Sequence, residues 1–276
     1  MESARRNAKA SSNGPRRTRR TCGACRKYAT PQNEIDPIFD EFGFEYATAG
    51  RIADQSGLDR MNEICRIKGR AGVGLLSALP VIDKRYGLPG LAEDVDSGRW
   101  IEADVKTPQG YTVTVVCVYV HAGNTDDPEK MKQKYRFLDT MLVRMGQLRD
   151  EAAHGGKQAV LCGDFNIAHT PLDIKNAKAN EKHAGFLPEE RAYVDKWLGE
   201  LEFVDVMRSL CGDIQGPYTW WSQRGRAFDN NVGWRIDYQF ATPELAETAR
   251  GFVIDKAPTY DLRWSDHAPL SITYDV

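Results

Sequence analysis

Short apolar blocks along the chain predict β-strands. Residues 73–76 (VGLL) and 111–120 (YTVTVVCVYV) are strongly apolar, and the second block is rich in β-branched residues. A third apolar block covers 159–162. The composition of three later segments also predicts strands, at 218–222, 235–241 and 270–274.

Between these strands, two stretches have the periodicity of amphipathic helices. Asp127 and Pro128 supply an N-cap and a first-turn proline, and Gly155 and Gly156 end the first helix. Its apolar residues recur every three or four positions and are Met131, Tyr135, Leu138, Leu142, Met145 and Leu148. A second helix is predicted after Pro188. The mixture predicts an α/β fold with sheets inside and helices outside.

The composition is that of a globular protein. Of 276 residues, 41% are hydrophobic and 28% are charged, which suits one large domain or two small ones. The formal net charge of −2 excludes a histone-like protein that coats nucleic acid through bulk charge, although a local basic surface remains compatible with it. No apolar stretch is long enough to span a bilayer and no signal-peptide core follows Met1, so we expect no membrane partner. Six sparse cysteines favour a reduced, cytoplasmic setting over a disulfide framework.

The first thirty residues differ from the rest in charge and in apolar content. They contain nine Lys or Arg and one acid, a charge of +8, which leaves −10 for residues 31–276. They contain no Val, Leu, Ile, Phe or Trp, so they predict a disordered basic tail that serves as a nucleic-acid-binding arm or a targeting signal. Cys22 and Cys25 have the spacing of half a zinc site, but no second pair accompanies them.

Polar residues with catalytic potential follow the predicted strands. Asp164 and Asn166 alternate around Phe165, so both polar side chains can leave one face while the ring enters the core. Asp237 lies in a later strand, and an Asp-His pair precedes the last one. Metal-assisted hydrolysis of a phosphate ester requires such oxygen ligands, a group that activates water and donors for the developing charge. Each fragment alone could equally form a turn or a satisfied hydrogen bond, so the hypothesis depends on their joint occurrence.

The motifs that contain these residues resemble those of the exonuclease III family. GDFNIA (163–168), YTWWS (218–222), GWRIDY (233–238) and SDHAPL (265–270) occur in that family's order and approximate spacing, and the similarity extends over residues 32–276. That family comprises apurinic/apyrimidinic (AP) endonucleases within the endonuclease/exonuclease/phosphatase superfamily. GDFN and SDH also fit sphingomyelinases, inositol-polyphosphate phosphatases and pancreatic-type nucleases, whereas YTWWS with GWRIDY favours the DNA-repair branch. The resemblance implies a four-layered α/β sandwich, in which two packed mixed β-sheets are flanked by helices.

The resemblance also implies catalytic roles. Asp164 would orient and deprotonate the attacking water, and Asn166 would hold the phosphate. His267, polarised by Asp237, would stabilise charge on a phosphoryl oxygen. Tyr119 would contact the phosphate or assist the leaving group, although an ordinary core position also suits this residue.

Ligands and partners are implied in the same way. The implied ligands of Mg²⁺, for which Mn²⁺ could substitute, are Asp164, Asn166, Asp266 and His267. The implied DNA-binding residues are Lys175, Arg224, Arg226 and Trp234. Trp234 would line the pocket for a flipped abasic sugar, unless it is a core aromatic, and the three basic residues would contact the DNA backbone. The implied partner is double-stranded DNA with abasic or blocked 3′ ends, bound by a monomer.

The resemblance fails at the start of the chain. The family begins with a strand that carries an Asn and a second strand that ends in QE, whose Glu is a principal metal ligand, and neither occurs here. Residues 1–31 match nothing in the family, and a shifted reading frame permits an amphipathic helix, an apolar strand and QE in this region. We therefore interpret residues 1–31 as the product of a frameshift. The interpretation predicts that 32–276 is a domain incomplete at its N-terminus, and that the chain is unstable and nearly inactive.

Three functions from different classes remain open. The first is a Mg²⁺-dependent DNA-repair nuclease that hydrolyses phosphodiester bonds at abasic sites and at 3′ ends. The second is a superfamily phosphodiesterase that acts on a lipid or a small phosphate, which the Trp-rich motifs disfavour. The third is a non-catalytic DNA-binding remnant. Cleavage of abasic duplex with Mg²⁺ and with chelator distinguishes the first from the other two.

Overall fold

A six-stranded mixed β-sheet forms the centre of the molecule. The structure is a computed structural model that describes residues 22–24, 59–64, 72–77, 79–91, 98–263 and 265–276. The strand order of the large sheet is β4-β5-β6-β7-β11-β8. These strands are Val81–Tyr86 (β4), Trp100–Lys106 (β5), Thr112–Tyr119 (β6), Gln158–Asp164 (β7), Val204–Asp205 (β8) and Asp237–Ala241 (β11). β6 and β7 are parallel, and the other neighbours are antiparallel.

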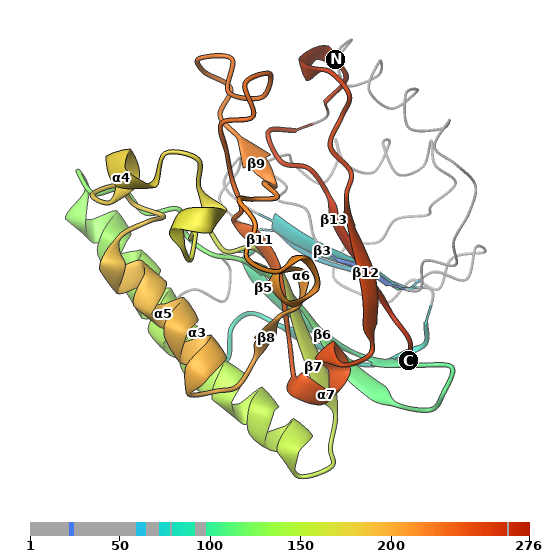
Figure 1. Cartoon of the computed structure of the whole chain (residues 1–276). Helices are drawn as coiled ribbons and strands as arrows, with labels where there is room; N and C mark the ends of the chain where they lie inside the picture. Colours follow the sequence, from blue (N-terminus) through green and yellow to red (C-terminus); the bar gives the residue numbers. More distant parts are fainter. Residues whose placement is uncertain (1–21, 25–58, 65–71, 78, 92–97, 264) are drawn as a thin grey trace.

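Two helices cover one face of this sheet. α3 (Pro128–Ala153) and α5 (Pro188–Gly199) lie side by side (Figure 1). α3 begins as predicted, because the Asp127 side chain accepts a hydrogen bond from the Lys130 amide and Pro128 stands in the first turn. Gly155, at φ 74°, follows its C-cap. The core between helices and sheet includes Trp100, Val116, Val118, Phe137, Leu138, Met141, Met145, Leu161, Phe165, Trp197 and Phe240.

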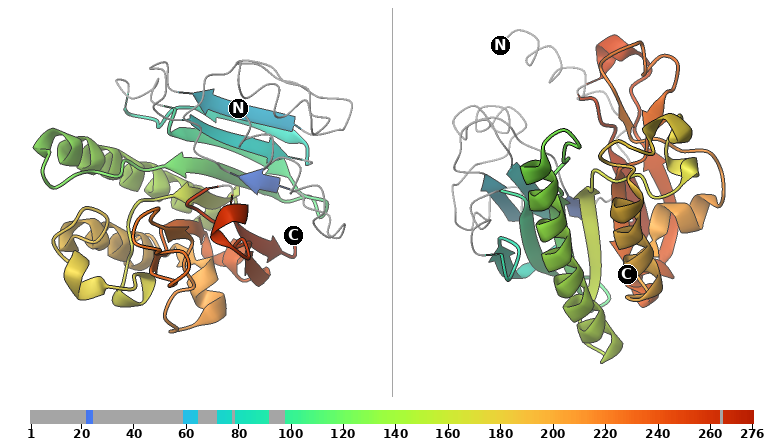
Figure 2. Two further views of the ribbon diagram at one scale, coloured as in Figure 1. Left: turned by 90° about the horizontal axis from the view of Figure 1, so that it is seen from above. Right: turned by 90° about the vertical axis from the view of Figure 1, so that its left-hand side faces the viewer.

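Two smaller sheets cover the opposite face. One contains β1 (Cys22–Ala24), β3 (Gly72–Ser77) and β2 (Asp59–Ile64) in that order, and its strands run beside those of the large sheet (Figure 2). The other pairs β12 (Ala249–Ile254) with β13 (Leu270–Tyr274). Side chains from the large sheet and from both smaller sheets share a second core that includes Val73, Leu75, Ile101, Val115, Cys162, Ala249 and Ile272. The predicted α/β sandwich is therefore confirmed, and the described residues supply a helix layer, the large sheet and a second strand layer.

Short elements complete the described chain. They are η3 (Pro171–Asp173), α4 (Ala177–Asn180), α6 (Val206–Cys211), β9 (Trp220–Trp221), β10 (Gly233–Trp234), α7 (Pro243–Ala246) and η4 (Tyr260–Leu262).

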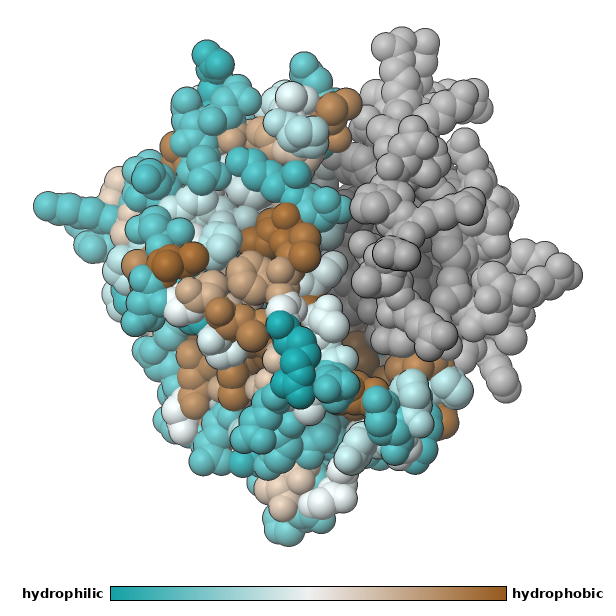
Figure 3. Space-filling view, turned by 45° about the vertical axis from the view of Figure 1, so that its right-hand side comes forward, coloured by the Kyte–Doolittle hydropathy of each residue, from teal (hydrophilic) through white to brown (hydrophobic). Residues whose placement is uncertain are grey.

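The β12–β13 pair leaves apolar surface outside: Val253 is 61% exposed, and apolar side chains gather on this face of the molecule (Figure 3).

The apolar pattern failed to predict β5 because two acidic residues interrupt it. Glu102 and Asp104 are both fully buried. Glu102 accepts hydrogen bonds from Arg144 of α3 at 2.8 Å, and Asp104 accepts one from Arg85 of β4 at 2.7 Å. Burial by itself would raise the pKa of each carboxyl, but the bonded cations lower the pKa of Glu102 and bring that of Asp104 to about 2. Paired charges thus occupy a strand that sequence reasoning expects to be apolar.

Most predicted strands are found, and two are shorter than predicted. The segments 73–76, 111–120, 159–162 and 270–274 correspond to β3, β6, β7 and β13. Within 218–222 only β9 pairs as a strand, and within 235–241 the strand is limited to β11. The reason is that the Arg235 amide donates to the Asp173 carbonyl and the Ile236 amide to the Thr219 hydroxyl, so these residues bond to loops.

Little of the N-terminal prediction can be compared with the structure. Of residues 1–31, only Cys22–Ala24 are described, and β1 is an edge strand that pairs antiparallel with β3. The disorder predicted for the rest of this segment lies outside the described residues. Cys117 is disulfide-bonded whereas Cys162 and Cys211 are free, so the expectation of reduced cysteines is wrong at Cys117. Within the described part of the chain, no helix has the length and apolar character needed to cross a membrane.

Phe165 should be one of the strongest single contributors to stability. It is fully buried and packs against Trp197, Tyr238 and Phe240 with ring-centroid distances of 5.7, 5.6 and 5.0 Å. We expect Phe165→Ala to lower the free energy of unfolding by about 3–5 kcal/mol, because it leaves a cavity in the core. Val143→Ala on the exposed face of α3 is the control and should change it by less than about 0.5 kcal/mol. Urea unfolding of both variants measures the difference, and equal effects would contradict the packing described here.

Candidate active site

Three predicted residues lie next to one another on adjacent strands of the large sheet. The parallel register of β6 and β7 places Tyr119 opposite Asp164. The antiparallel register of β7 and β11 places Asp164 opposite Asp237. Directly opposed residues project from the same face of a sheet. The ends of β6 and β7 and the start of β11 therefore build one row of polar side chains.

His267 reaches this row from a loop that β9 holds in place. A bridge pairs Trp220 with His267, and the Trp221 amide donates to the carbonyl that precedes His267 at 2.9 Å. On the other side, the Ala268 amide donates to the Thr219 carbonyl at 2.7 Å. The YTWWS and SDHAPL segments, far apart in sequence, are thus joined through their backbones.

The imidazole of His267 bridges two carboxylates. Its Nδ1 lies 2.9 Å from Asp237 Oδ2, and its Nε2 lies 3.7 Å from Asp164 Oδ2. Burial lowers the pKa of His267, but the charges of Asp237, Asp164 and Asp266 outweigh burial and raise the pKa to about 9. The ring is therefore an imidazolium at neutral pH, which can donate hydrogen bonds but cannot accept a proton.

A tight turn after β7 carries Asn166. Its backbone has φ 51°, a left-handed conformation that Asn adopts more readily than most residues. Its amide donates to Asp164 Oδ1 at 2.9 Å, and its side-chain Nδ2 donates to the Val120 carbonyl at 2.8 Å and to Asp164 Oδ2 at 3.2 Å. Asn166 therefore fixes the Asp164 carboxylate.

The predicted metal ligands include side chains whose chemistry suits a divalent cation. Asp164, Asn166 and Asp266 offer the oxygen donors that Mg²⁺ prefers. Asp266, however, accepts hydrogen bonds from Trp220 Nε1 at 3.0 Å and from Ser265 Oγ at 3.2 Å. Burial raises the pKa of Asp266, yet the bond from Trp220 and the charge of His267 give it a net lowered pKa. Among the described residues, no three His, Cys, Asp or Glu side chains form a group that could hold a metal ion.

The predicted DNA-contacting residues fall into two groups. Trp234 of β10 packs edge-on against Trp220 at a centroid distance of 6.0 Å, and exposed Lys175 adjoins it because the Lys175 amide donates to the Gly233 carbonyl. Arg224 and Arg226 are exposed on the loop between β9 and β10, at the top of Figure 1. Lys175 and Trp234 are thus brought together, whereas the two arginines lie on a separate projecting loop.

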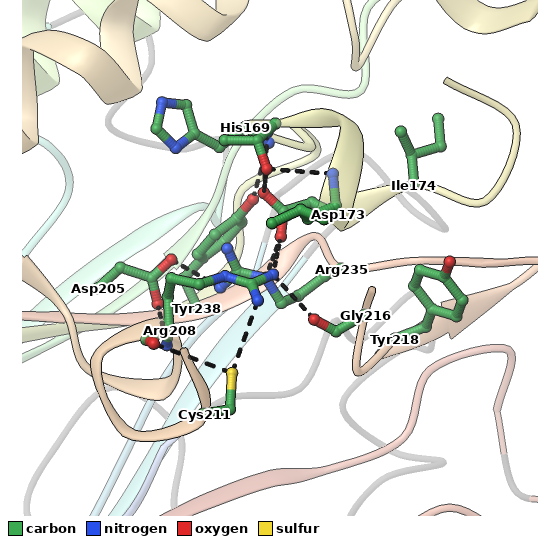
Figure 4. Close-up of polar contacts among 12 residues, drawn as sticks. His169, Asp173, Ile174, Asp205, Arg208, Cys211, Gly216, Tyr218, Arg235 and Tyr238 are labelled. Carbon is green, nitrogen blue, oxygen red and sulfur yellow. Dashed lines mark hydrogen bonds and ion pairs between the residues drawn. The ribbon is translucent and has the colours of Figure 1, made fainter. Parts of the chain in front are cut away.

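A buried charge network supports the segment between β10 and β11, which joins Trp234 to Asp237. Arg235 is fully buried, and it donates to Asp173 Oδ1 and to Asp205 Oδ2, each at 2.7 Å (Figure 4). Arg208 also donates to Asp173, at 2.5 Å, and to the carbonyl of Gly216 at 2.8 Å. The network thereby connects η3, α6 and the loop before β9 to the segment between β10 and β11.

Sequence reasoning did not identify Arg235, although it lies inside a motif that was singled out. Its charge suggests a surface residue, and the carboxylates that neutralise it are 62 and 30 positions away. Sequence reasoning also missed Arg99, because its charge suggests a surface residue and its partner Tyr119 is 20 positions away. Its guanidinium lies 4.5 Å from the centre of the Tyr119 ring, and it donates to the Tyr119 carbonyl at 3.1 Å.

The chain is similar in sequence and in fold to known proteins. The sequence model of the Endonuclease/Exonuclease/phosphatase family matches residues 28–267. The chain belongs to this family. An exodeoxyribonuclease of Bacillus subtilis (strain 168) is 32% identical over 209 residues, which cover 76% of either chain. An AP endonuclease from Archaeoglobus fulgidus is 28% identical, with a TM-score of 0.71 over 91% of this chain and 87% of that one. The 3′-5′ exonuclease NExo from Neisseria meningitidis is 25% identical, with a TM-score of 0.74 over 98% and 93%.

These similarities confirm the predicted family and enzyme class. Within the endonuclease/exonuclease/phosphatase family, the relatives are named exodeoxyribonuclease and AP endonuclease, so the chain is a hydrolase of the exonuclease III type. The four motifs used for that prediction contain Asp164 and Asp237, which lie in one row with Tyr119, and the loop that carries His267. They also contain the contacting pair Trp220 and Trp234. The roles of the individual residues are a separate question.

The raised pKa of His267 predicts that stability depends on pH when no divalent metal is present. A pKa of about 9 in the folded protein against 6.5 in the unfolded chain means that the protonated ring stabilises the fold. This stabilisation is complete below pH 6.5 and is lost as the pH rises through about 9. We expect the urea midpoint, measured in chelator, to fall over this interval in the wild type and much less in His267→Gln. An equal fall in both proteins would show that another group titrates.

Proposed function

We propose that this protein is a DNA-repair nuclease that hydrolyses phosphodiester bonds at abasic sites and at 3′ ends. The observation that carries the proposal is the row of Tyr119, Asp164 and Asp237 with His267 bridging its two carboxylates. The names of the relatives, an exodeoxyribonuclease and an AP endonuclease, are the source of the two activities. We assign the catalytic domain to residues 32–276 and propose that it acts as a monomer.

The protonation states divide the catalytic roles. His267 is an imidazolium at neutral pH, so it donates to a phosphoryl oxygen and stabilises the charge that develops there. Asp164 is then the neighbouring group that can act as base. Water attacks phosphorus and gives its proton to Asp164. The ester bond between phosphorus and the sugar oxygen breaks, and that oxygen takes up a proton from bulk water. Asp237 keeps the imidazole oriented through its 2.9 Å contact with Nδ1.

The remaining residues bind the substrate in this proposal. Asn166 and Tyr119 flank Asp164 and hold the phosphate. Trp234, supported edge-on by Trp220, forms a wall against the abasic sugar. Exposed Lys175 contacts the DNA backbone beside it, and Arg224 and Arg226 do so from the projecting loop.

We propose that the reaction depends on Mg²⁺, with Mn²⁺ as a substitute. The oxygen donors near Asp164 suit such an ion, and Mg²⁺ usually keeps several waters when few carboxylates bind it. Because the described residues form no cluster of three ligating side chains, we expect weak metal affinity. When bound, the ion would supply positive charge to the phosphate.

Replacing Asp164 tests the proposed base. Asp164→Asn keeps the shape of the side chain but cannot accept a proton from water, so we expect kcat on an abasic duplex to fall by at least about 10²–10³-fold. Asp213→Asn, at an exposed carboxylate after α6, is the matched control and should leave kcat unchanged. Both are measured with Mg²⁺ and with chelator. Full activity in Asp164→Asn would overturn the assigned role, and wild-type cleavage of a phospholipid or inositol phosphate but not of DNA would favour the alternative phosphodiesterase.

A second experiment tests our interpretation of residues 1–31. Replacing them with the shifted reading, preceded by the family's first strand, restores a carboxylate ligand and an apolar strand. We expect a higher thermal unfolding temperature, greater incision of abasic DNA and half-maximal activity at a lower Mg²⁺ concentration than in the chain as it stands. Equal stability and equal Mg²⁺ dependence of the two proteins would refute the frameshift and the predicted impairment.

A further inference from the structure

One buried cation of α3 makes contacts that packing of the helix does not require. Lys134 is fully buried, as is the Glu190 side chain with which it forms an ion pair at 2.5 Å. Its ammonium also donates to the Asn166 carbonyl at 2.9 Å and to the Ala122 carbonyl at 3.1 Å. Lys134 therefore joins the loop after β6, the turn after β7 and the start of α5.

The Asn166 carbonyl is a sensitive point for catalysis. Asn166 has a left-handed backbone, so its conformation requires support from outside the turn. The same residue donates both its amide and its Nδ2 to the carboxylate of Asp164. A shift of this carbonyl would therefore move the group to which we assign the base.

Glu190 connects the ion pair to the segment that packs against Trp234. Its Oε2 accepts hydrogen bonds from the Gly185 amide at 2.6 Å and from the Leu187 amide at 3.0 Å. Gly185, at φ 95°, is so close to its neighbours that a Cβ there would lie 3.0 Å from the Trp234 ring and 3.2 Å from the Asn166 carbonyl. The Lys134–Glu190 ion pair thus lies behind both the Asp164–Asn166 turn and Trp234.

We propose that Lys134, held by Glu190, is a positioning residue for hydrolysis that fixes the Asp164–Asn166 turn through the Asn166 carbonyl. The proposal rests on the function proposed above. Lys134 does not touch the substrate, and its effect should therefore appear in the rate of the chemical step more than in DNA binding.

α3 itself offers the matched control. Arg144 lies on the same helix and pairs with buried Glu102 at 2.8 Å, on strand β5 instead of at the turn. Lys134→Met removes the ion-pair partner of buried Glu190, and Arg144→Met removes one of the two arginines that pair with buried Glu102, the other being Arg85. Both substitutions should therefore lower the thermal unfolding temperature. A general loss of stability is then expected in both variants and does not by itself distinguish them.

Steady-state kinetics on abasic duplex, below the unfolding temperature of each variant, separate the two residues. We expect Lys134→Met to lower kcat by about 10²-fold while KM changes by less than about threefold, because a small displacement of reacting groups is costly. Arg144→Met should retain kcat. Unchanged kcat in Lys134→Met, or an equal loss in both variants, would overturn the proposal. If Lys134→Met does not fold, Lys134→Met/Glu190→Gln removes both charges and keeps an acceptor for Gly185 and Leu187, and full kcat in this variant would also overturn it.

Hydrogen exchange provides a measurement that does not depend on activity. We expect the amides of residues 164–168 to exchange faster in Lys134→Met than in the wild type, and at the wild-type rate in Arg144→Met. Identical exchange of this segment in the two variants would refute the positioning role. If the wild type cleaves no substrate at all, the proposed function fails, and the exchange comparison still decides whether Lys134 holds the turn.

Discussion

The parallel pairing of β6 with β7 is the interaction on which the rest of the structure depends. A parallel pair needs a crossover connection, and α3 provides it, so the carboxyl ends of both strands meet at one edge of the sheet. The pairing sets Tyr119 opposite Asp164, and β11 then adds Asp237 from the other side. A slip of one residue in either register would turn these side chains to the opposite face. The candidate active site is thus a consequence of strand register before any individual contact is formed.

Buried ion pairs fix the parts of the molecule that register cannot. Removing a charged group from water is costly, and the cost is offset only where the partner and further hydrogen bonds are well placed. Lys134–Glu190 joins two loops and a helix, and Arg235 with Asp173 holds η3 against β10. Arg144–Glu102 instead ties α3 to β5 of the large sheet. The Lys134–Glu190 and Arg235–Asp173 pairs lie behind residues of the candidate site. The free energy spent on burying these charges therefore maintains the geometry of that site.

Electrostatics distinguishes the members of the site from ordinary turn residues. Three carboxylates raise the pKa of one histidine to about 9, even though its burial acts in the opposite direction. In the function proposed above, an imidazolium held between Asp237 and Asp164 binds the anionic phosphate, and Asp164 acts as the base. The same concentration of negative charge is where a divalent cation would be favoured, so metal binding and the charge of His267 are expected to influence each other.

Local patterns in the sequence determined the two long helices and several of the strands. β3, β6, β7 and β13 are apolar blocks, and α3 has its cap, its proline and its stripe of apolar residues within one segment. The motifs around Asp164, Asp237 and His267 also determined the family, because residue type and order are properties of the sequence. Tertiary structure decided what these patterns could not contain. The register that aligns Tyr119 with Asp164, the pairing of Lys134 with Glu190, and the burial of Glu102 in a strand all involve residues distant in sequence. A charged residue carries no local signal of a buried partner, since the free energy that compensates its desolvation arises only when the folded chain brings the opposite charge to it.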